Sequence, residues 1–228
     1  MSYIFYGISL QNKRPNNMDS LLLKGKYIEG KSALLAVVCD GVGSLENGLF
    51  ASTTSTKMLS GWFDTTENIN CIGINMRDAV LEINSHIISE AQHADIHTAS
   101  TLSALLLIED TFYIVHIGDS RVYSSDGKTL TQITSDDVSA SGKLTACIGQ
   151  SEKVIVKYYE GMAEGITFIV CTDGLYKRMD IDLMVAMMSA SNKASRRALK
   201  KAIEILTLYV MKQGEQDNIT IALVKGRN

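Results

Sequence analysis

One stretch of the chain carries the strongest signal for the fold: residues 32–44, which read SALLAVVCDGVGS. Residues 32–39 form a run of strand length that is apolar after Ser32, and such a run is typical of a β-strand buried on both faces. Asp40 follows the run directly, with Gly41 and Gly43 next to it. The stretch therefore predicts a core strand with an acidic side chain at its end.

Outward from this stretch, the chain predicts strands in consecutive groups and helices in pairs. Alternation and turn residues predict strands over 3–10, 103–108, 111–117, 121–124, 154–159, 166–171 and 219–225, with hairpin turns at 109–110 and 125–128. Helical spacing of apolar residues predicts helices over 47–63, 70–94, 181–190 and 194–213. This order favours antiparallel sheets with helices outside over a doubly wound βαβ fold. No linker or repeat divides the chain, so we expect one domain over residues 1–228.

The composition excludes several classes of protein. The chain has 228 residues, of which 46% are hydrophobic and 21% charged, and these values exclude a wholly disordered protein. A net charge of -3 provides no basic field for nucleic acid. The longest apolar run, 33–39, is far shorter than the roughly 20 residues of a membrane helix. No signal peptide is visible and the four cysteines are widely spaced, so we expect a soluble, cytoplasmic monomer with reduced, buried thiols and no membrane or nucleic-acid partner.

Aspartates stand where several strands are expected to end or begin. Asp40, Asp119 and Asp173 each follow an apolar run and lie near a glycine, and Asp217 precedes such a run. One aspartate of this kind is ordinary turn chemistry, but several that converged would repel one another unless a metal ion or basic side chains lay between them. Carboxylate and carbonyl oxygens suit magnesium, manganese or calcium. Two such ions can activate a water and neutralise a phosphoryl group.

Seven motifs follow one another along the chain: Arg14-x-x-Asn17-x-Asp19, Asp40-Gly41-Val42-Gly43-Ser44, Thr98-Ala99-Ser100-Thr101-Leu102, Gly118-Asp119-Ser120-Arg121, Leu144-Thr145-Ala146-Cys147-Ile148-Gly149, Cys171-Thr172-Asp173-Gly174-Leu175 and Asp217-Asn218-Ile219-Thr220. In this order they resemble the metal-dependent protein phosphatase family, of the protein phosphatase 2C type, in its compact bacterial form. The resemblance covers residues 14 to about 225. It implies an α+β fold, a four-layer α-β-β-α sandwich of two antiparallel sheets with helical pairs on both outer faces.

The resemblance also implies a site that holds two manganese or magnesium ions. Asp40 would bridge the ions, Asp173 and Asp217 would complete the ligands of one ion, and the carbonyl of Gly41 would serve the other. Asp19 would order metal-bound water.

The function implied is that of a serine/threonine phosphoprotein phosphatase, a hydrolase of phosphate monoesters in which the water between the ions attacks phosphorus. Arg14 would hold the phosphate through its planar fork. Phosphorylated proteins are the implied substrates, and a Ser/Thr kinase is a candidate partner. The substrate could equally be a regulator of a transcription factor.

Several positions depart from the family pattern. Met18 replaces an acidic residue or an amide, and Lys177 replaces an aspartate that would bind a third ion together with Asp119. The segment between residues 134 and 144, where relatives carry a longer flap, is short. These departures leave a third ion open, and the Lys177 ammonium could take its place. They also keep a rival interpretation open, a catalytically weak pseudophosphatase that acts as a regulatory binding module.

Other signals have ordinary explanations. Gly41-x-Gly43 lacks the third glycine of a dinucleotide-binding loop, because Glu46 stands there. His93 and His97 have a zinc-ligand spacing, but the glutamate of H-E-x-x-H is absent, which favours a solvated helix end. A basic cluster indicates a solvated helix face, with docking of an acidic partner as the alternative; it comprises Lys193, Arg196, Arg197, Lys200 and Lys201.

Overall fold

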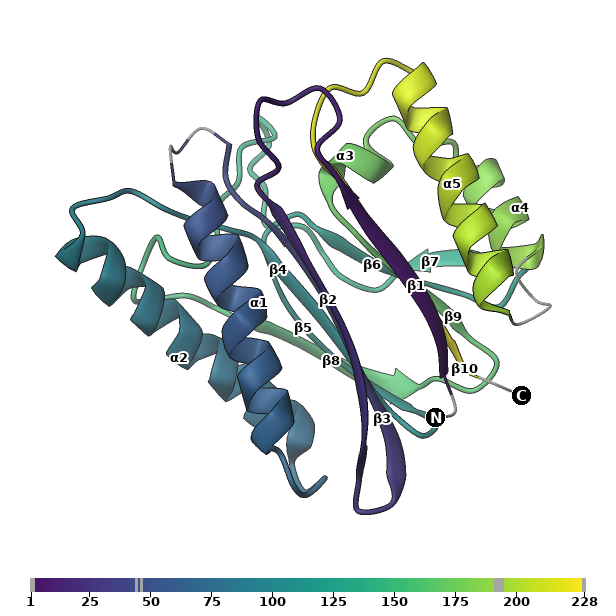
Figure 1. Ribbon diagram of the computed structural model, residues 1–228, viewed down its shortest axis with the longest axis horizontal. Helices are drawn as coiled ribbons and strands as arrows, with labels where there is room; N and C mark the ends of the chain where they lie inside the picture. Colours follow the sequence, from purple (N-terminus) through teal and green to yellow (C-terminus); the bar gives the residue numbers. More distant parts are fainter. Residues whose placement is uncertain (1–2, 44, 46, 191–194, 227–228) are drawn as a thin grey trace.

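Two antiparallel sheets stack face to face at the centre of the molecule, and helices cover the outer face of each (Figure 1). The structure is a computed structural model that describes residues 3–43, 45, 47–190 and 195–226. Within these residues each sheet has five strands. The predicted four-layer α-β-β-α sandwich is confirmed.

The run at 32–39 forms most of the strand β3 (Lys31–Asp40), and every residue of the run is buried. Successive side chains of a strand point to opposite faces. Leu35 and Val37 accordingly pack into the core under the helices α1 (Gly48–Thr65) and α2 (Ile72–His93), whereas Leu34 and Val38 pack into the core between the two sheets. The strand is therefore buried on both faces, as its sequence predicts.

The first sheet has the strand order β2-β3-β4-β5-β8, and all of its neighbours run antiparallel. Its strands are β2 (Asp19–Ile28), β3 (Lys31–Asp40), β4 (Leu102–Ile108), β5 (Thr111–Ile117) and β8 (Lys157–Met162). The second sheet has the order β1-β10-β9-β6-β7, also antiparallel. Its strands are β1 (Tyr3–Leu10), β6 (Arg121–Ser125), β7 (Leu130–Gln132), β9 (Thr167–Cys171) and β10 (Ile219–Gly226).

The helices divide between the two outer faces. They are α1 (Gly48–Thr65), α2 (Ile72–His93), α3 (Asp173–Tyr176), α4 (Ile181–Ala190) and α5 (Arg196–Lys212). Helices α1 and α2 cover the first sheet, and α4 and α5 cover the second (Figure 1). In α2 the buried residues Met76, Val80, Ile83 and Ile87 follow the helical period, which explains why this helix could be predicted from its sequence.

The antiparallel register brings the aspartate-bearing strand ends to one end of the sandwich. Asp19 at the start of β2 lies opposite Asp40 at the end of β3. In the other sheet Ile221 of β10 pairs with Cys171, the last residue of β9. Asp173 therefore follows β9 at the same edge at which Asp217 precedes β10.

The structure also differs from the sequence-based expectations at several elements. The strand expected over 154–159 is β8, which begins only at Lys157, because Val154 and Val156 pack against the core without joining the ladder. The strand β2 was not predicted, because its half-exposed sequence, DSLLLKGKYI, lacks strict alternation. The short elements β7 and α3 also lay outside the prediction. Cys71 is exposed, whereas the other three cysteines are buried as expected. No helix of the described residues is long and apolar enough to cross a membrane.

Candidate active site

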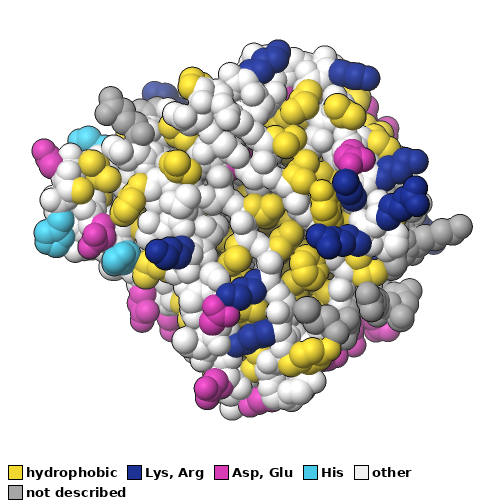
Figure 2. Space-filling model, viewed as in Figure 1, with side chains coloured by type: hydrophobic (Ala, Val, Ile, Leu, Met, Phe, Trp, Pro, Cys, Tyr) yellow, Lys and Arg dark blue, Asp and Glu magenta, His cyan; other side chains and the backbone are white. Residues whose placement is uncertain are grey.

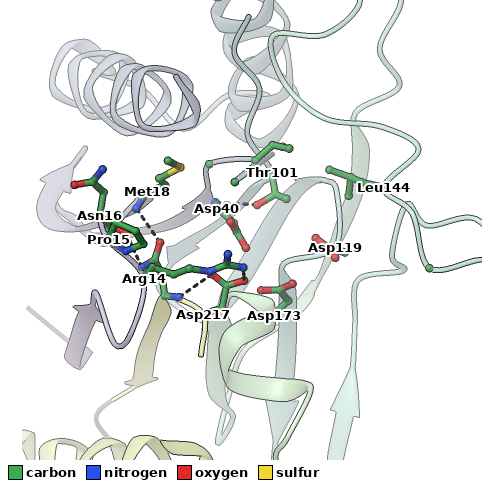
Figure 3. A pocket seen from close by; sticks show the side chains of 15 residues that line it. Arg14, Pro15, Asn16, Met18, Asp40, Thr101, Asp119, Leu144, Asp173 and Asp217 are labelled. Atoms are coloured by element: carbon green, nitrogen blue, oxygen red, sulfur yellow. Dashed lines mark hydrogen bonds and ion pairs between the residues drawn. The ribbon is translucent and has the colours of Figure 1, made fainter. Parts of the chain in front are cut away.

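A pocket of about 660 Å³ opens at the end of the sandwich where these strand ends meet (Figure 3). Asp40, Asp119, Asp173 and Asp217 line it together with Arg14. The four carboxylates come from the end of β3, the turn after β5, the start of α3 and the residue pair before β10. The structure thus brings together aspartates that are up to 177 residues apart in the sequence.

Asp40 stands at the electrostatic centre of this group. Burial and the nearby charges of Asp19 and Asp173 raise the pKa of Asp40 well above its usual range. None of the hydrogen bonds among the described residues reaches its carboxylate, although its backbone is firmly held. A carboxylate in such surroundings favours either a proton or a cation as its partner.

Asp19 lies behind the pocket and joins the two sheets. Its Oδ2 accepts hydrogen bonds from the hydroxyls of Thr172, at 3.0 Å, and Thr220, at 2.6 Å. Thr172 directly follows β9 of the second sheet, and Thr220 belongs to β10 of the same sheet. Burial raises the pKa of Asp19 to about 7, although these two hydrogen bonds oppose the rise. The side chain is buried and does not line the pocket itself.

Two cations engage the carboxylates at the mouth. Arg14 forms a bidentate pair with Asp217, with Nε to Oδ1 at 2.8 Å and an Nη to Oδ2 at 2.7 Å. Although burial opposes it, this pair and the backbone N–H of Asn218 hold the pKa of Asp217 below its usual value. On the other side, the ammonium of Lys177 contacts Oδ2 of Asp173. Burial and the charge of Asp173 raise the pKa of Asp119 to about 6, against the opposing charge of Lys177.

The residues Ser100 and Thr101 clamp the loop that carries Asp40. The Thr101 hydroxyl accepts a hydrogen bond from the Asp40 N–H at 3.0 Å, and the Thr101 N–H donates to the Asp40 carbonyl at 2.9 Å. The Ser100 hydroxyl donates to the same carbonyl at 2.9 Å. Thr101 also shares a 2.6 Å hydrogen bond with the hydroxyl of Ser120, beside Asp119. Both residues belong to the motif Thr98-Ala99-Ser100-Thr101-Leu102, but nothing in that motif alone predicts their contacts with Asp40.

Two glycines permit the close approach of the loops. A Cβ added at Gly41 would lie 2.6 Å from the backbone of Gly48, and one at Gly174 would lie 2.0 Å from the carbonyl oxygen of Asn218. No side chain fits at such distances. The turns after β3 and β9 therefore require glycine next to Asp40 and Asp173.

The short flap folds over the edge of the pocket. The carboxylate of Asp137 accepts a hydrogen bond from the Gly118 N–H at 3.0 Å. It also forms an ion pair with Lys157, whose Nζ lies 2.6 Å from Oδ1. Beyond it, Val138 and Leu144 form an isolated bridge, which closes a tight loop between them. Leu144 lines the pocket beside the aspartates (Figure 3). The segment is thus short, and it is held in place by the internal bridge and by contacts with Gly118 and Lys157.

The donor set fits magnesium or manganese in its chemistry. The side-chain donors that line the pocket are oxygens of aspartate, threonine and asparagine, and no Cys or His among the described residues lines it. In the arrangement of the described side chains, no three His, Cys, Asp or Glu close on one point. Arg14 and Lys177 already engage two of the carboxylates. Divalent cations that bound in this pocket would compete with these two residues.

The other signals in the sequence lie away from the pocket. Figure 2 shows histidine side chains on the surface over α2. His93 is the last residue of that helix, and His97 lies beyond it; both are exposed. Lys and Arg side chains gather over α5 in the same view. On this helix, Nζ of Lys200 lies 3.8 Å from Oε1 of Glu204. Lys193 lies outside the described residues.

Comparison with known proteins connects this pocket to a family. The sequence profile described as Protein phosphatase 2C matches residues 10–213 of the chain. The chain belongs to the protein phosphatase 2C family. The prediction of a protein phosphatase is confirmed at the level of this family.

Individual relatives agree with the family assignment. The protein named Serine/threonine phosphatase stp from Listeria welshimeri is 26% identical over 216 aligned residues, which cover 84% of each chain. Protein phosphatase PhpP from Streptococcus pneumoniae is 27% identical and covers 93% of this chain and 92% of its own. The crystal structure of serine/threonine phosphatase Stp1 from Staphylococcus aureus has a TM-score of 0.87 at 19% identity, over 100% of this chain and 96% of that one. The last comparison shows that the folds are alike.

Proposed function

We propose that the chain is a metal-dependent serine/threonine phosphoprotein phosphatase, built as one domain over residues 1–228, that uses two manganese or magnesium ions. The observation that carries the proposal is the single pocket in which Asp40, Asp119, Asp173 and Asp217 meet Arg14. The name of the Listeria welshimeri relative, Serine/threonine phosphatase stp, supports serine and threonine specificity. Phosphorylated proteins are therefore the proposed substrates.

The proposed roles follow from the positions of the side chains. When bound, two divalent ions would supply an activated water and would neutralise charge on the phosphoryl group. Asp40 is the proposed ligand of both ions, with Asp173, Asp217 and the carbonyl of Gly41 as the further ligands. Asp19 accepts its two hydroxyl hydrogen bonds on Oδ2, which leaves Oδ1 to accept a hydrogen bond from water.

Arg14 is the proposed phosphate-binding side chain. Two of its N–H groups bind Asp217, and among the described residues no acceptor engages the other three. These can bind phosphate oxygens while the pair with Asp217 holds the guanidinium plane in place. Arg14→Met should therefore raise the KM for a phosphopeptide about 10-fold to 100-fold and change kcat less. An unchanged KM would contradict the role of Arg14.

Hydrolysis assays test the proposal. We would measure turnover of an aryl phosphate and of a phosphothreonine peptide with manganese, with magnesium and with a chelator. Asp40→Asn should lower kcat/KM by more than about 100-fold, since it removes the proposed shared ligand. Asp95→Asn is the matched control, because Asp95 is exposed and its left-handed φ of 51° suits asparagine.

The outcome separates the catalyst from the regulatory module. Metal-dependent turnover that Asp40→Asn abolishes and Asp95→Asn retains would support the phosphatase. A folded protein without turnover under any metal would refute it and favour the pseudophosphatase, the interpretation that Met18, Lys177 and the short flap motivate.

A further inference from the structure

Lys177 extends one helical turn beyond Asp173 and forms an ion pair with it. The ammonium contacts Oδ2 of Asp173, whose side chain is 14% exposed, whereas the lysine side chain is 55% exposed. Lys177 lies beside the pocket and is not part of its lining. A contact with a mostly buried carboxylate distinguishes this lysine from an ordinary surface lysine, whose ion pairs contribute little.

The turn that carries Lys177 is held rigidly. Gly174 lies against the carbonyl oxygen of Asn218, where even a Cβ would not fit. The Tyr176 hydroxyl donates to the carbonyl of Asp119 at 2.9 Å, and the guanidinium of Arg121 stacks 3.6 Å from the Tyr176 ring centre. The turn therefore fixes the point from which Lys177 extends.

The charge of Lys177 acts on the whole acidic group. Its ammonium contacts Oδ2 of Asp173, one of the pocket carboxylates. A lysine ammonium carries a positive charge at neutral pH. Lys177 therefore adds a positive charge beside these carboxylates.

A count of charges shows what this lysine does to the capacity of the pocket for cations. The acidic group comprises Asp19, Asp40, Asp119, Asp173 and Asp217. With Arg14 and Lys177 opposed to them, three negative charges are left when all are ionised. Two divalent ions more than neutralise these charges, and a third would enter a site that is already positive.

We infer that the Lys177 ammonium takes the place of a third divalent ion: it offsets the negative charge of Asp119 and Asp173, so that the pocket holds two divalent ions and no third. The inference rests on the proposed function, because it concerns the same pocket. It assigns Lys177 a positioning role, since the ammonium acts through the two aspartates.

Calorimetric titration of the full chain with manganese tests this inference by metal binding alone. The variants are Lys177→Met, which removes the charge but keeps the length, and Lys177→Asp, which adds an oxygen donor. Lys201→Met is the matched control, because Lys201 is an exposed lysine on α5, away from the pocket. Thermal unfolding in chelator verifies that each variant is folded.

The wild-type chain and Lys201→Met should each bind two ions. Lys177→Met should bind its weakest ion about tenfold more tightly, because a competing charge is gone. Lys177→Asp should bind one ion more than the wild type. Wild-type isotherms for both Lys177 variants, weaker binding by Lys177→Met, or three ions in the wild-type chain would overturn the inference. A wild-type chain that binds no manganese would instead overturn the proposed function.

Discussion

Acid should destabilise this protein through His116, a histidine that is fully buried in β5. Its Nε2 lies 3.2 Å from the carbonyl oxygen of Ser135 and its Nδ1 lies 2.9 Å from the hydroxyl of Ser103. A carbonyl can only accept, so Nε2 carries the proton of the neutral ring. Nδ1 and the carbonyl of Ser120, at 3.1 Å, are then both acceptors for the single Ser103 hydroxyl proton. Burial, aided by the charge of Lys157 and opposed by Asp137, lowers the pKa of His116 to about 4.

The sign of the effect follows from the two protonation states. Between pH 6.5 and about 4, the unfolded chain binds a proton at this histidine that the folded chain does not bind. The stability that neutral His116 contributes is therefore complete above pH 6.5 and is lost as the pH falls toward 4. At 1.36 kcal/mol for each pKa unit, the free energy of unfolding loses about 3 kcal/mol across this range.

Chemical denaturation in chelator at pH values from 7.5 to 4.5 measures the effect. His116→Gln keeps an N–H for the carbonyl of Ser135 but does not titrate, so the difference in unfolding free energy between the wild type and this variant should shrink as the pH falls. His86→Gln, at an exposed position of α2, should run parallel to the wild type. A difference between wild type and His116→Gln that stays constant over this range would refute the reasoning.

Further substitutions test the clamp and the close contacts. Thr101→Val should lower the unfolding free energy by about 1–3 kcal/mol, because the Asp40 N–H loses its acceptor, and it should weaken manganese binding in calorimetry. Thr101→Ser keeps the hydroxyl and should restore both properties. Unchanged manganese binding by Thr101→Val would contradict the clamp. Gly174→Ala should cost at least about 3 kcal/mol in thermal unfolding, since its Cβ would lie 2.0 Å from the carbonyl oxygen of Asn218. Gly61→Ala, in open space within α1, should instead stabilise by about 0.5–1 kcal/mol, and equal effects of the two alanines would contradict the packing argument.

Local patterns predicted most of the fold, because most of its elements have a local cause. The apolar run of β3 matches a strand that is buried on both faces, and the helical period of the apolar residues in α2 matches the one face of that helix that is buried. The strand β2 was harder to predict, since it lies at a sheet edge and six of its residues in succession are half-exposed. At 154–159 the apolar pattern was real but served packing against the core, because ladder pairing begins only at Lys157. Patterns of hydrophobicity report burial directly and hydrogen-bonded pairing only indirectly.

For the site, the sequence could provide the residues but only some of their partners. The pair between Lys177 and Asp173 has an i, i+4 spacing and is local. The pair between Arg14 and Asp217 joins residues 203 positions apart, and no local pattern connects them. The hydroxyl of Thr101 likewise gains its role only when β4 lies beside β3.

Asp19 shows why the site and the sandwich must form together. It belongs to the first sheet, but the threonine hydroxyls that bind its carboxylate come from the residue after β9 and from β10 of the second, 153 and 201 residues away. If the sheets separated, Asp19 would lose both hydroxyls, and Asp40 in the first sheet would part from Asp173 and Asp217, which adjoin β9 and β10 of the second. Conversely, the repulsion among these carboxylates opposes docking of the sheets until cations offset it. Divalent ions that bind all three should therefore stabilise the docked sheets as well as serve the reaction, because ligands that bind only the folded state favour it.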